Sequence, residues 1–167
     1  MGAAGRTRPR HQEATTPPLA KVLVRYDGGG GKALNARQLQ RLRRLTDYRA
    51  ATRRLFIFEL LVPPEPAPQA QLMIDAINQC QDAVVEPDVW KIEGLDQRHD
   101  AEMVVEAARR DGRTTVGCMV LGRGSDEAAV VRWLKIAAGV PGFIGFAIGR
   151  TTWWDAIGAW RSKGISR

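Results

Sequence analysis

The chain has 167 residues, 44% of them hydrophobic and 26% charged, which is the composition of one ordinary soluble domain without a membrane-spanning or secretory segment. Its two cysteines, Cys80 and Cys118, form neither a disulfide framework nor a zinc motif, so we expect a cytoplasmic protein without a metal ion or cofactor. The net charge of +7 is spread along the chain rather than gathered into one stripe, and this distribution argues against a nucleic-acid partner.

Helical and strand patterns alternate after a basic leader. Residues 1–18 are rich in Gly, Arg, Thr and Pro, which is typical of a disordered basic tail, and we treat 19–167 as one domain. Short apolar runs typical of strands occur at 21–27, 54–62, 88–95, 114–122 and 142–150. Helical patterns occur at 35–48, 69–83, 100–112, 125–139 and 151–164.

Particular residues are expected to mark the helix ends. Asn35 is the expected N-cap of the first helix, and Gly112 occupies a C-cap position at the end of the third. Ser125 and Asp126 are good capping residues at the start of the fourth helix. The first helix has arginines at helical spacing, which is typical of a solvated face: Arg37, Arg41 and Arg44. The tryptophans are expected in the core and in helix packing: Trp90, Trp133, Trp153, Trp154 and Trp160.

The alternation of strands and helices predicts the fold class. Five strands followed by five helices in turn are typical of βαβ units, which build a parallel sheet with right-handed crossovers. Several strands are apolar on both faces, as buried parallel strands are. Two architectures fit this pattern: an open doubly wound sheet, and part of a (β/α)8 barrel. A whole barrel has about 250 residues and eight such units.

Ionisable residues interrupt three consecutive predicted strands. Lys21 opens the first strand, Glu59 lies inside the second, and Lys91 lies inside the third. Glu93 follows two residues after Lys91 and therefore points the same way, because strand side chains alternate between faces. Polar groups near the carboxyl ends of barrel strands form active sites. We therefore expect Lys21, Glu59 and Lys91 to form one catalytic cluster.

Two lysines beside a carboxylate suit Schiff-base chemistry. A lysine attacks a ketone only as the neutral amine, and burial and a second cation both lower the pKa of a lysine. A carboxylate can then move protons between the imine intermediates. The alternative is a purely structural pair of lysine and glutamate, or a lysine whose ammonium group reaches water at a strand end. Spacing alone leaves both interpretations open.

Glycine-rich segments follow the last two predicted strands. Gly122, Arg123 and Gly124 precede one helix, and Gly149 and Arg150 precede the next. Glycines let backbone amides approach an anion, and a helix N-terminus favours a phosphate group. The loops after the last two strands of (β/α)8 barrels frequently bind phosphate, so we expect a phosphate site here. Ordinary turn glycines beside exposed arginines would give the same pattern.

Three segments resemble a known family. They are EPDVWKIEGLD (86–96), VGCMVLGRGSDE (116–127) and VPGFIGFAIGRTTWW (140–154). They resemble the aldolase-like domain found C-terminal to 5-dehydro-2-deoxygluconokinase in bacterial inositol catabolism. That domain is similar to class I tagatose-1,6-bisphosphate aldolases, which are (β/α)8 barrels. The resemblance covers residues 20–160, to within a few residues at either end.

The resemblance implies a role for each candidate residue. Lys91 matches the Schiff-base lysine of the family, Glu59 the glutamate that transfers protons, and Lys21 the lysine that contacts substrate. The segments Gly122–Gly124 and Gly149–Arg150 match its phosphate-binding strand ends, although the family has Ser-Ala-Gly at the first of them. The implied substrate is 5-dehydro-2-deoxy-gluconate 6-phosphate, which would give dihydroxyacetone phosphate and malonate semialdehyde.

No segment of this sequence matches the first three strands of the family's barrel. The chain thus resembles the C-terminal five-eighths of an aldolase, and a sheet of five strands would leave two unpaired edges and a site open to water. We therefore expect a truncated aldolase-like domain with impaired activity, which could be complemented at its edges by a second copy or another chain. The alternative is a catalytically inactive remnant, or a module that binds sugar phosphates or a partner.

Overall fold

The structure is a computed structural model that describes residues 18–64 and 67–163. Nearly all of the predicted tail, residues 1–17, lies outside the described residues, and the domain boundary at residue 19 stays a prediction. Within the described ranges, no helix is both long and apolar enough to cross a membrane.

The described chain alternates strands and helices in the predicted order. The strands are β1 (Leu19–Arg25), β2 (Leu55–Leu61), β3 (Val89–Glu93), β4 (Gly117–Leu121) and β5 (Phe143–Ala147). The helices are α2 (Lys32–Thr52), α3 (Gln69–Asp82), α4 (Arg98–Ala108), the short 3-10 helix η2 (Arg110–Gly112), α5 (Glu127–Ala138) and α6 (Arg150–Lys163). All five predicted strands and all five predicted helices are therefore present, with shifted ends.

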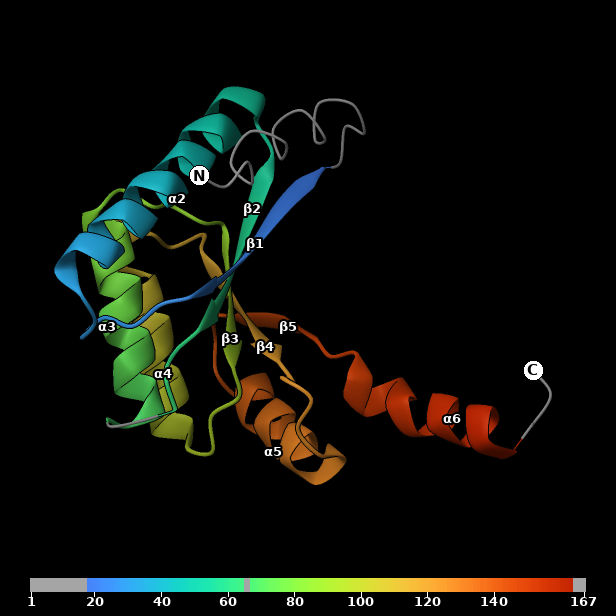
Figure 1. Cartoon of the computed structure of the whole chain (residues 1–167). Coiled ribbons are helices and arrows are strands. Elements are labelled where there is room, and N and C mark those ends of the chain that lie inside the picture. The colour runs from blue at the N-terminus through green and yellow to red at the C-terminus, as the bar shows by residue number, and fades with distance from the viewer. Residues whose placement is uncertain (1–17, 65–66, 164–167) are drawn as a thin grey trace.

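The strands form one parallel sheet in the order β1-β2-β3-β4-β5. A doubly wound sheet reverses its strand order at a switch point and carries helices on both faces. Here each strand lies beside the next one along the chain, and α2, α3 and α4 stack on the same side of the sheet (Figure 1). The α/β prediction is confirmed, and of the two predicted architectures the structure has the barrel-like one.

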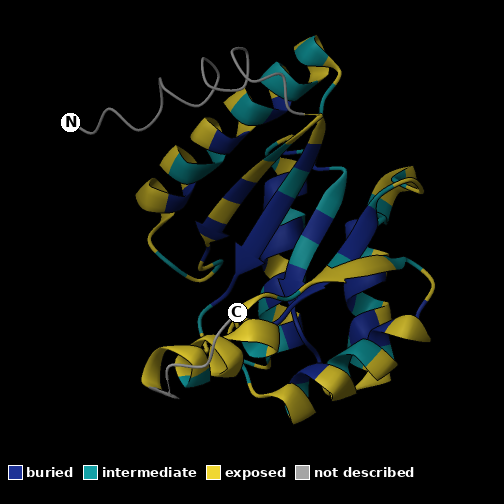
Figure 2. Cartoon of the chain, turned by 90° about the vertical axis from the view of Figure 1, so that its right-hand side faces the viewer, coloured by how far each residue is buried: buried dark blue, intermediate teal, exposed yellow. Residues whose placement is uncertain are grey.

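The core fills the space between the sheet and its helices. Phe58, Trp90 and Ile92 point toward the helices and are at most 1% exposed. The ring centroids of Phe58 and Trp90 lie 4.8 Å apart, and Figure 2 shows the central strands as the buried middle of the molecule. Because side chains alternate along a strand, Glu59 and Lys91 point to the opposite face, which the helices leave uncovered.

The start of α2 differs from its prediction. The helix begins at Lys32 with Gly31 at the N-cap, so the prediction of Asn35 as N-cap is wrong. The side-chain amide of Asn35 instead donates a hydrogen bond to the carbonyl oxygen of Asp27, at 2.8 Å. This contact ties the first turn of the helix to the loop that follows β1, a connection that the local sequence pattern does not reveal.

The ends of α4 and α5 give one wrong prediction and one confirmed one. The helix α4 ends at Ala108, and Gly112 closes the 3-10 helix η2 with φ +79° instead of capping α4. Asp126 caps α5 as predicted, because its carboxylate accepts a hydrogen bond from the backbone N–H of Ala129 at 2.8 Å. Ser125 lies outside that helix, one residue before the cap.

The tryptophans divide between the core and the surface. Trp90 is buried, and Trp133 on α5 packs directly on the backbone of Gly94. Trp153, Trp154 and Trp160 are exposed, so the prediction that they pack in the core is wrong. The physical reason is the position of α6, which extends away from the sheet (Figure 1).

Both edges of the sheet lack a neighbouring strand within the described part of the chain. The strand β1 pairs only with β2, and β5 pairs only with β4. Each edge strand exposes large apolar side chains, as the yellow of β5 in Figure 2 illustrates. These side chains are Leu19 and Leu23 on β1, and Ile144 and Phe146 on β5.

Candidate functional site

Lys21, Glu59 and Lys91 lie side by side on the uncovered face of the sheet. Glu59 on β2 is directly opposite Lys91 on β3, and Lys21 lies on the neighbouring strand β1. The Nζ atoms of Lys21 and Lys91 lie 2.5 Å and 3.2 Å from the same carboxylate oxygen, Oε2 of Glu59. The three residues predicted to act together thus lie in one cluster, in which Glu59 contacts both lysines.

The two lysines differ in their access to water. The side chain of Lys91 is 14% exposed, whereas that of Lys21 on the edge strand is 48% exposed. An ammonium group that has lost most of its water needs a partner, and Glu59 supplies one to Lys91. The cluster therefore consists of an inner and an outer lysine that share one carboxylate.

The ionisation of Glu59 follows from this geometry. Burial is the largest single influence and favours the protonated acid, but hydrogen bonds and charge from Lys21 and Lys91 together outweigh it. The pKa of Glu59 consequently lies below its usual value, and the group is a carboxylate at neutral pH. In this state it can accept a proton from a bound molecule.

Glu93 joins the site from the same strand as Lys91. It is 3% exposed, its Oε2 accepts a hydrogen bond from the backbone N–H of Val62 at 3.3 Å, and its Oε1 forms an ion pair with Arg123. The sequence placed Glu93 on the same face as Lys91 but did not identify it as a candidate. The available signal was its spacing of two residues from Lys91 within an apolar strand.

The two predicted phosphate-binding segments meet at the carboxyl ends of β4 and β5. Nη2 of Arg150 donates to the carbonyl oxygen of Arg123 at 3.4 Å, and the hydroxyl of Thr151 donates to the carbonyl oxygen of Ser125 at 2.7 Å. Gly124 has φ +82°, and a Cβ atom there would lie 3.0 Å from the Arg150 guanidinium. Glycine at this position therefore permits both the turn and the approach of Arg150.

The helices that follow these segments differ at their N-termini. The N-terminus of α5 already holds an anion, since the carboxylate of Asp126 accepts the backbone N–H of Ala129. The helix α6 starts at Arg150, immediately after Gly149 and beside the turn formed by Gly122–Gly124. That turn and the start of α6 are therefore better candidates for an anion than the N-terminus of α5.

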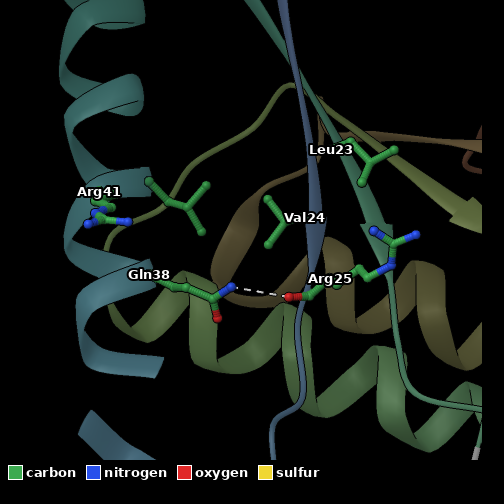
Figure 3. A pocket seen from close by; sticks show the side chains of 6 residues that line it. Leu23, Val24, Arg25, Gln38 and Arg41 are labelled. Atoms are coloured by element: carbon green, nitrogen blue, oxygen red, sulfur yellow. Dashed lines mark hydrogen bonds between the residues drawn. The ribbon is translucent and has the colours of Figure 1, made fainter. Parts of the chain in front are cut away.

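A pocket elsewhere on the molecule is separate from the lysine cluster. It lies between the edge strand β1 and helix α2, where Leu23 and Val24 point to opposite sides of the strand (Figure 3). Its lining residues are Leu23, Val24, Arg25, Gln38, Arg41 and Leu42. The side-chain amide of Gln38 donates to the carbonyl oxygen of Arg25 at 3.2 Å across the pocket.

In the residues that the structure describes, no group of three His, Cys, Asp or Glu side chains is arranged to hold a metal ion.

Solved structures include a protein of similar fold. It is a Schiff-base-forming fructose-1,6-bisphosphate aldolase, which matches this chain with a TM-score of 0.64 and 17% sequence identity. The match covers 86% of this chain and 55% of the aldolase chain, so this chain spans about half the length of that protein. A likeness at this identity establishes an aldolase-like barrel fold and no more. Among curated proteins, none matches the sequence.

A family model matches nearly the whole sequence, from residue 13 to residue 166. The family is described as "Uncharacterized protein conserved in bacteria", a description that mentions neither a kinase nor a tagatose aldolase. The fold supports the aldolase-like part of the resemblance found in the sequence. By the extent of the match, the chain belongs to this family of conserved bacterial proteins, DUF2090.

Proposed function

We propose that the chain carries the site of a class I aldolase, a carbon–carbon lyase that works through a Schiff base on Lys91. The observation that carries this proposal is the convergence of Lys21 and Lys91 on one carboxylate oxygen of Glu59. Imine chemistry requires an amine nucleophile and a group that moves protons, and this cluster contains both. The similarity of the fold to a Schiff-base-forming aldolase supports the proposal.

In the proposed reaction, Lys91 passes its ammonium proton to Glu59, and the free amine attacks the ketone carbon. Glu59 then returns the proton to the hydroxyl of the carbinolamine, which leaves as water and gives a protonated imine. The imine accepts the electron pair of the neighbouring carbon–carbon bond as that bond breaks, which leaves an enamine on the lysine. The hydroxyl proton beside the broken bond passes to Glu59 as an aldehyde leaves. Protonation of the enamine carbon and addition of water then release the ketone and restore Lys91.

The proposed substrate is a phosphorylated keto sugar acid, such as 5-dehydro-2-deoxy-gluconate 6-phosphate in cytoplasmic inositol catabolism. The family resemblance implies this substrate, and the proposed phosphate site consists of Gly122–Gly124 and Gly149–Arg150. Two observations support that site: the guanidinium groups of Arg123 and Arg150 come from these adjacent segments, and the backbone of the first segment has the left-handed conformation at Arg123 and Gly124. Successive backbone N–H groups in such turns form concave anion sites.

A second candidate function is a module that binds sugar phosphates without catalysis. It is favoured by the pairing of Lys91 with Glu59, which occupies the proposed nucleophile, and by the open face of a sheet with five strands. Water at an open site weakens the electrostatic interactions on which imine chemistry depends. Such a module would bind a phosphate ligand and form no adduct on Lys91.

We also propose that the open edges of the sheet associate with a second copy of the chain or with a complementing chain. Unpaired strand edges with apolar side chains favour pairing with another strand. Both β1 and β5 have these properties in the described structure. Association would also exclude water from the lysine cluster, which adjoins β1 through Lys21.

Trapping of the imine tests the proposed reaction. Borohydride reduces an imine to a stable secondary amine, so incubation with dihydroxyacetone phosphate should leave an adduct on Lys91 that peptide mass spectrometry locates. We expect Lys91→Ala to lose the adduct and Lys135→Ala, at an exposed lysine on α5, to retain it. An unlabelled wild-type protein, or a Lys91→Ala variant labelled as strongly as wild type, would contradict the proposal. A rise in Tm with this ligand and no adduct would favour the binding module.

A further inference from the structure

Glu93 is a buried carboxylate that the proposed lysine chemistry does not use. Its two oxygens have different partners, the N–H of Val62 directly after the end of β2 and the guanidinium of Arg123 beyond the end of β4. Glu93 itself belongs to β3, two residues after Lys91. One side chain thus connects the carboxyl ends of three neighbouring strands.

Arg123 reaches this carboxylate from an unusual backbone conformation. Its φ is +50°, in the left-handed region that residues other than glycine seldom adopt, and Gly124 follows with φ +82°. The backbone N–H of Ser125 donates to the carbonyl oxygen of Gly122 at 2.9 Å, which closes the turn. Arg123 thus occupies a strained backbone position at the point where its side chain meets a buried anion, and such strain is typical of functional sites.

In the ion pair of Glu93 and Arg123, the carboxylate is buried and the guanidinium is partly exposed to water. The side chain of Glu93 is 4% exposed, whereas that of Arg123 is 45% exposed. A guanidinium group has five N–H donors and binds carboxylate and phosphate oxygens alike. Anchored by Glu93 at Nη1, Arg123 still presents an exposed cationic surface beside Arg150, whose Nη2 donates to the backbone carbonyl of Arg123.

We infer that Glu93 is a positioning residue for anion binding. Through its ion pair with Arg123 it holds the turn of Gly122–Gly124 at a fixed place relative to Lys91, and so sets where the phosphate of a substrate lies. The inference rests on the proposed function, because it assigns Glu93 to the phosphate end of the same site. Glu93 contacts neither the reacting carbon nor the transferred proton.

A comparison of phosphorylated and unphosphorylated ketones tests whether Glu93 positions the phosphate site or only stabilises the fold. In Glu93→Gln, we expect the concentration of dihydroxyacetone phosphate that gives half-maximal borohydride labelling to rise about tenfold, the effect of losing one charged hydrogen bond. For dihydroxyacetone, which has no phosphate, we expect labelling to stay within about twofold of wild type, since Lys91 and Glu59 are intact. Glu102→Gln, which breaks the exposed pair with Arg98, should change neither value.

Inorganic phosphate provides a readout that does not depend on the imine. Titration calorimetry should detect phosphate binding to wild type and to Glu102→Gln, and about tenfold weaker binding to Glu93→Gln. If no ketone labels the wild type, the proposed reaction is wrong, and the role of Glu93 is decided by phosphate alone. Phosphate binding by Glu93→Gln equal to that of wild type, or no binding by wild type, would overturn the inference.

A second variant covers the case in which Glu93→Gln does not fold. Arg123→Gln removes the exposed partner of the pair, and we expect it to show the same selective loss for phosphate-bearing ligands. Circular dichroism checks that each variant is folded before binding is measured. An equal loss for dihydroxyacetone and for dihydroxyacetone phosphate in the folded variant would overturn the inference, because it would place the pair in the general structure of the site.

Discussion

Glu59 is the residue on which the lysine cluster depends. Its Oε2 atom is the shared partner of the Lys21 and Lys91 ammonium groups, and it is nearly buried between them. Removing the shared anion would leave two cations close together, one of them with little access to water. The exposed Lys21 could turn toward solvent, so the cost arises mainly at Lys91.

The substitution Glu59→Gln is expected to destabilise the protein by about 1–3 kcal/mol at pH 7, the usual cost of losing a hydrogen bond to charged groups. The folded pKa of Glu59 is lowered from the ordinary value of 4.5. Its stabilising effect is therefore fully present above pH 4.5 and is lost as the pH falls through the lower folded pKa.

Urea unfolding of wild type and Glu59→Gln at several pH values checks this expectation. The difference in free energy of unfolding should narrow below pH 4.5, where wild type loses the contribution of Glu59. The matched control is Glu102→Gln, which breaks a solvent-exposed pair on α4 and should cost at most about 0.5 kcal/mol. A difference between wild type and Glu59→Gln that does not change with pH would contradict the assigned ionisation.

At the scale of elements, the contact between α5 and the loop after β3 depends on the absence of a side chain at Gly94. Trp133 on α5 lies so close to the loop after β3 that a Cβ atom at Gly94 would be 2.0 Å from Cδ2 of its ring. The indole N–H of Trp133 also donates to Asp96 at 2.9 Å, two residues further along. These contacts hold the helix against the loop that directly follows the strand with Lys91 and Glu93.

We expect Gly94→Ala to destabilise the protein by about 1–3 kcal/mol, because the added methyl group forces Trp133 and α5 away from the loop after β3. Gly158→Ala on α6 is the matched control, since an added Cβ there meets nothing within 4 Å. Alanine in a helix interior is favoured over glycine by about 1 kcal/mol, so that control should be neutral or stabilising. Thermal unfolding followed by circular dichroism measures both, and equal Tm values for Gly94→Ala and wild type would contradict the packing argument.

For the whole molecule, the open sheet edges predict association. Phe146 on the edge strand β5 is 60% exposed, and a lysine on an edge strand opposes pairing with another strand. Wild type should therefore show a mass above the monomer mass of 18.4 kDa in light scattering, increasing with concentration. Phe146→Lys should shift the mass toward the monomer.

The matched control for association is Leu34→Lys on α2, a leucine that is 56% exposed but lies outside the sheet. It should leave the measured mass unchanged, because the edges of β1 and β5 remain as they are. A wild-type mass of 18.4 kDa at every concentration would contradict self-association through the edges.

Local patterns in the sequence predicted the elements and much of the proposed site. Alternation along single strands placed Lys91 and Glu93 on one face, and the order of strands brought Lys21, Glu59 and Lys91 into one cluster, although their catalytic roles stay predictions. The start of α2 and the end of α4 were predicted wrongly, because the contact of Asn35 with Asp27 and the turn at η2 depend on the path of the connecting chain.

The sequence by itself determined the α/β class, since periodicity is a property of residues close along the chain. Only the tertiary structure decided that the strands follow one another in a barrel-like sheet, that α6 exposes its tryptophans, and that Glu93 pairs with Arg123. Glu93 and Arg123 are 30 residues apart, and their contact depends on how two strands and a turn are arranged in space. Local periodicity contains no information on such distant pairs, so the packing of the whole sheet is what selects them.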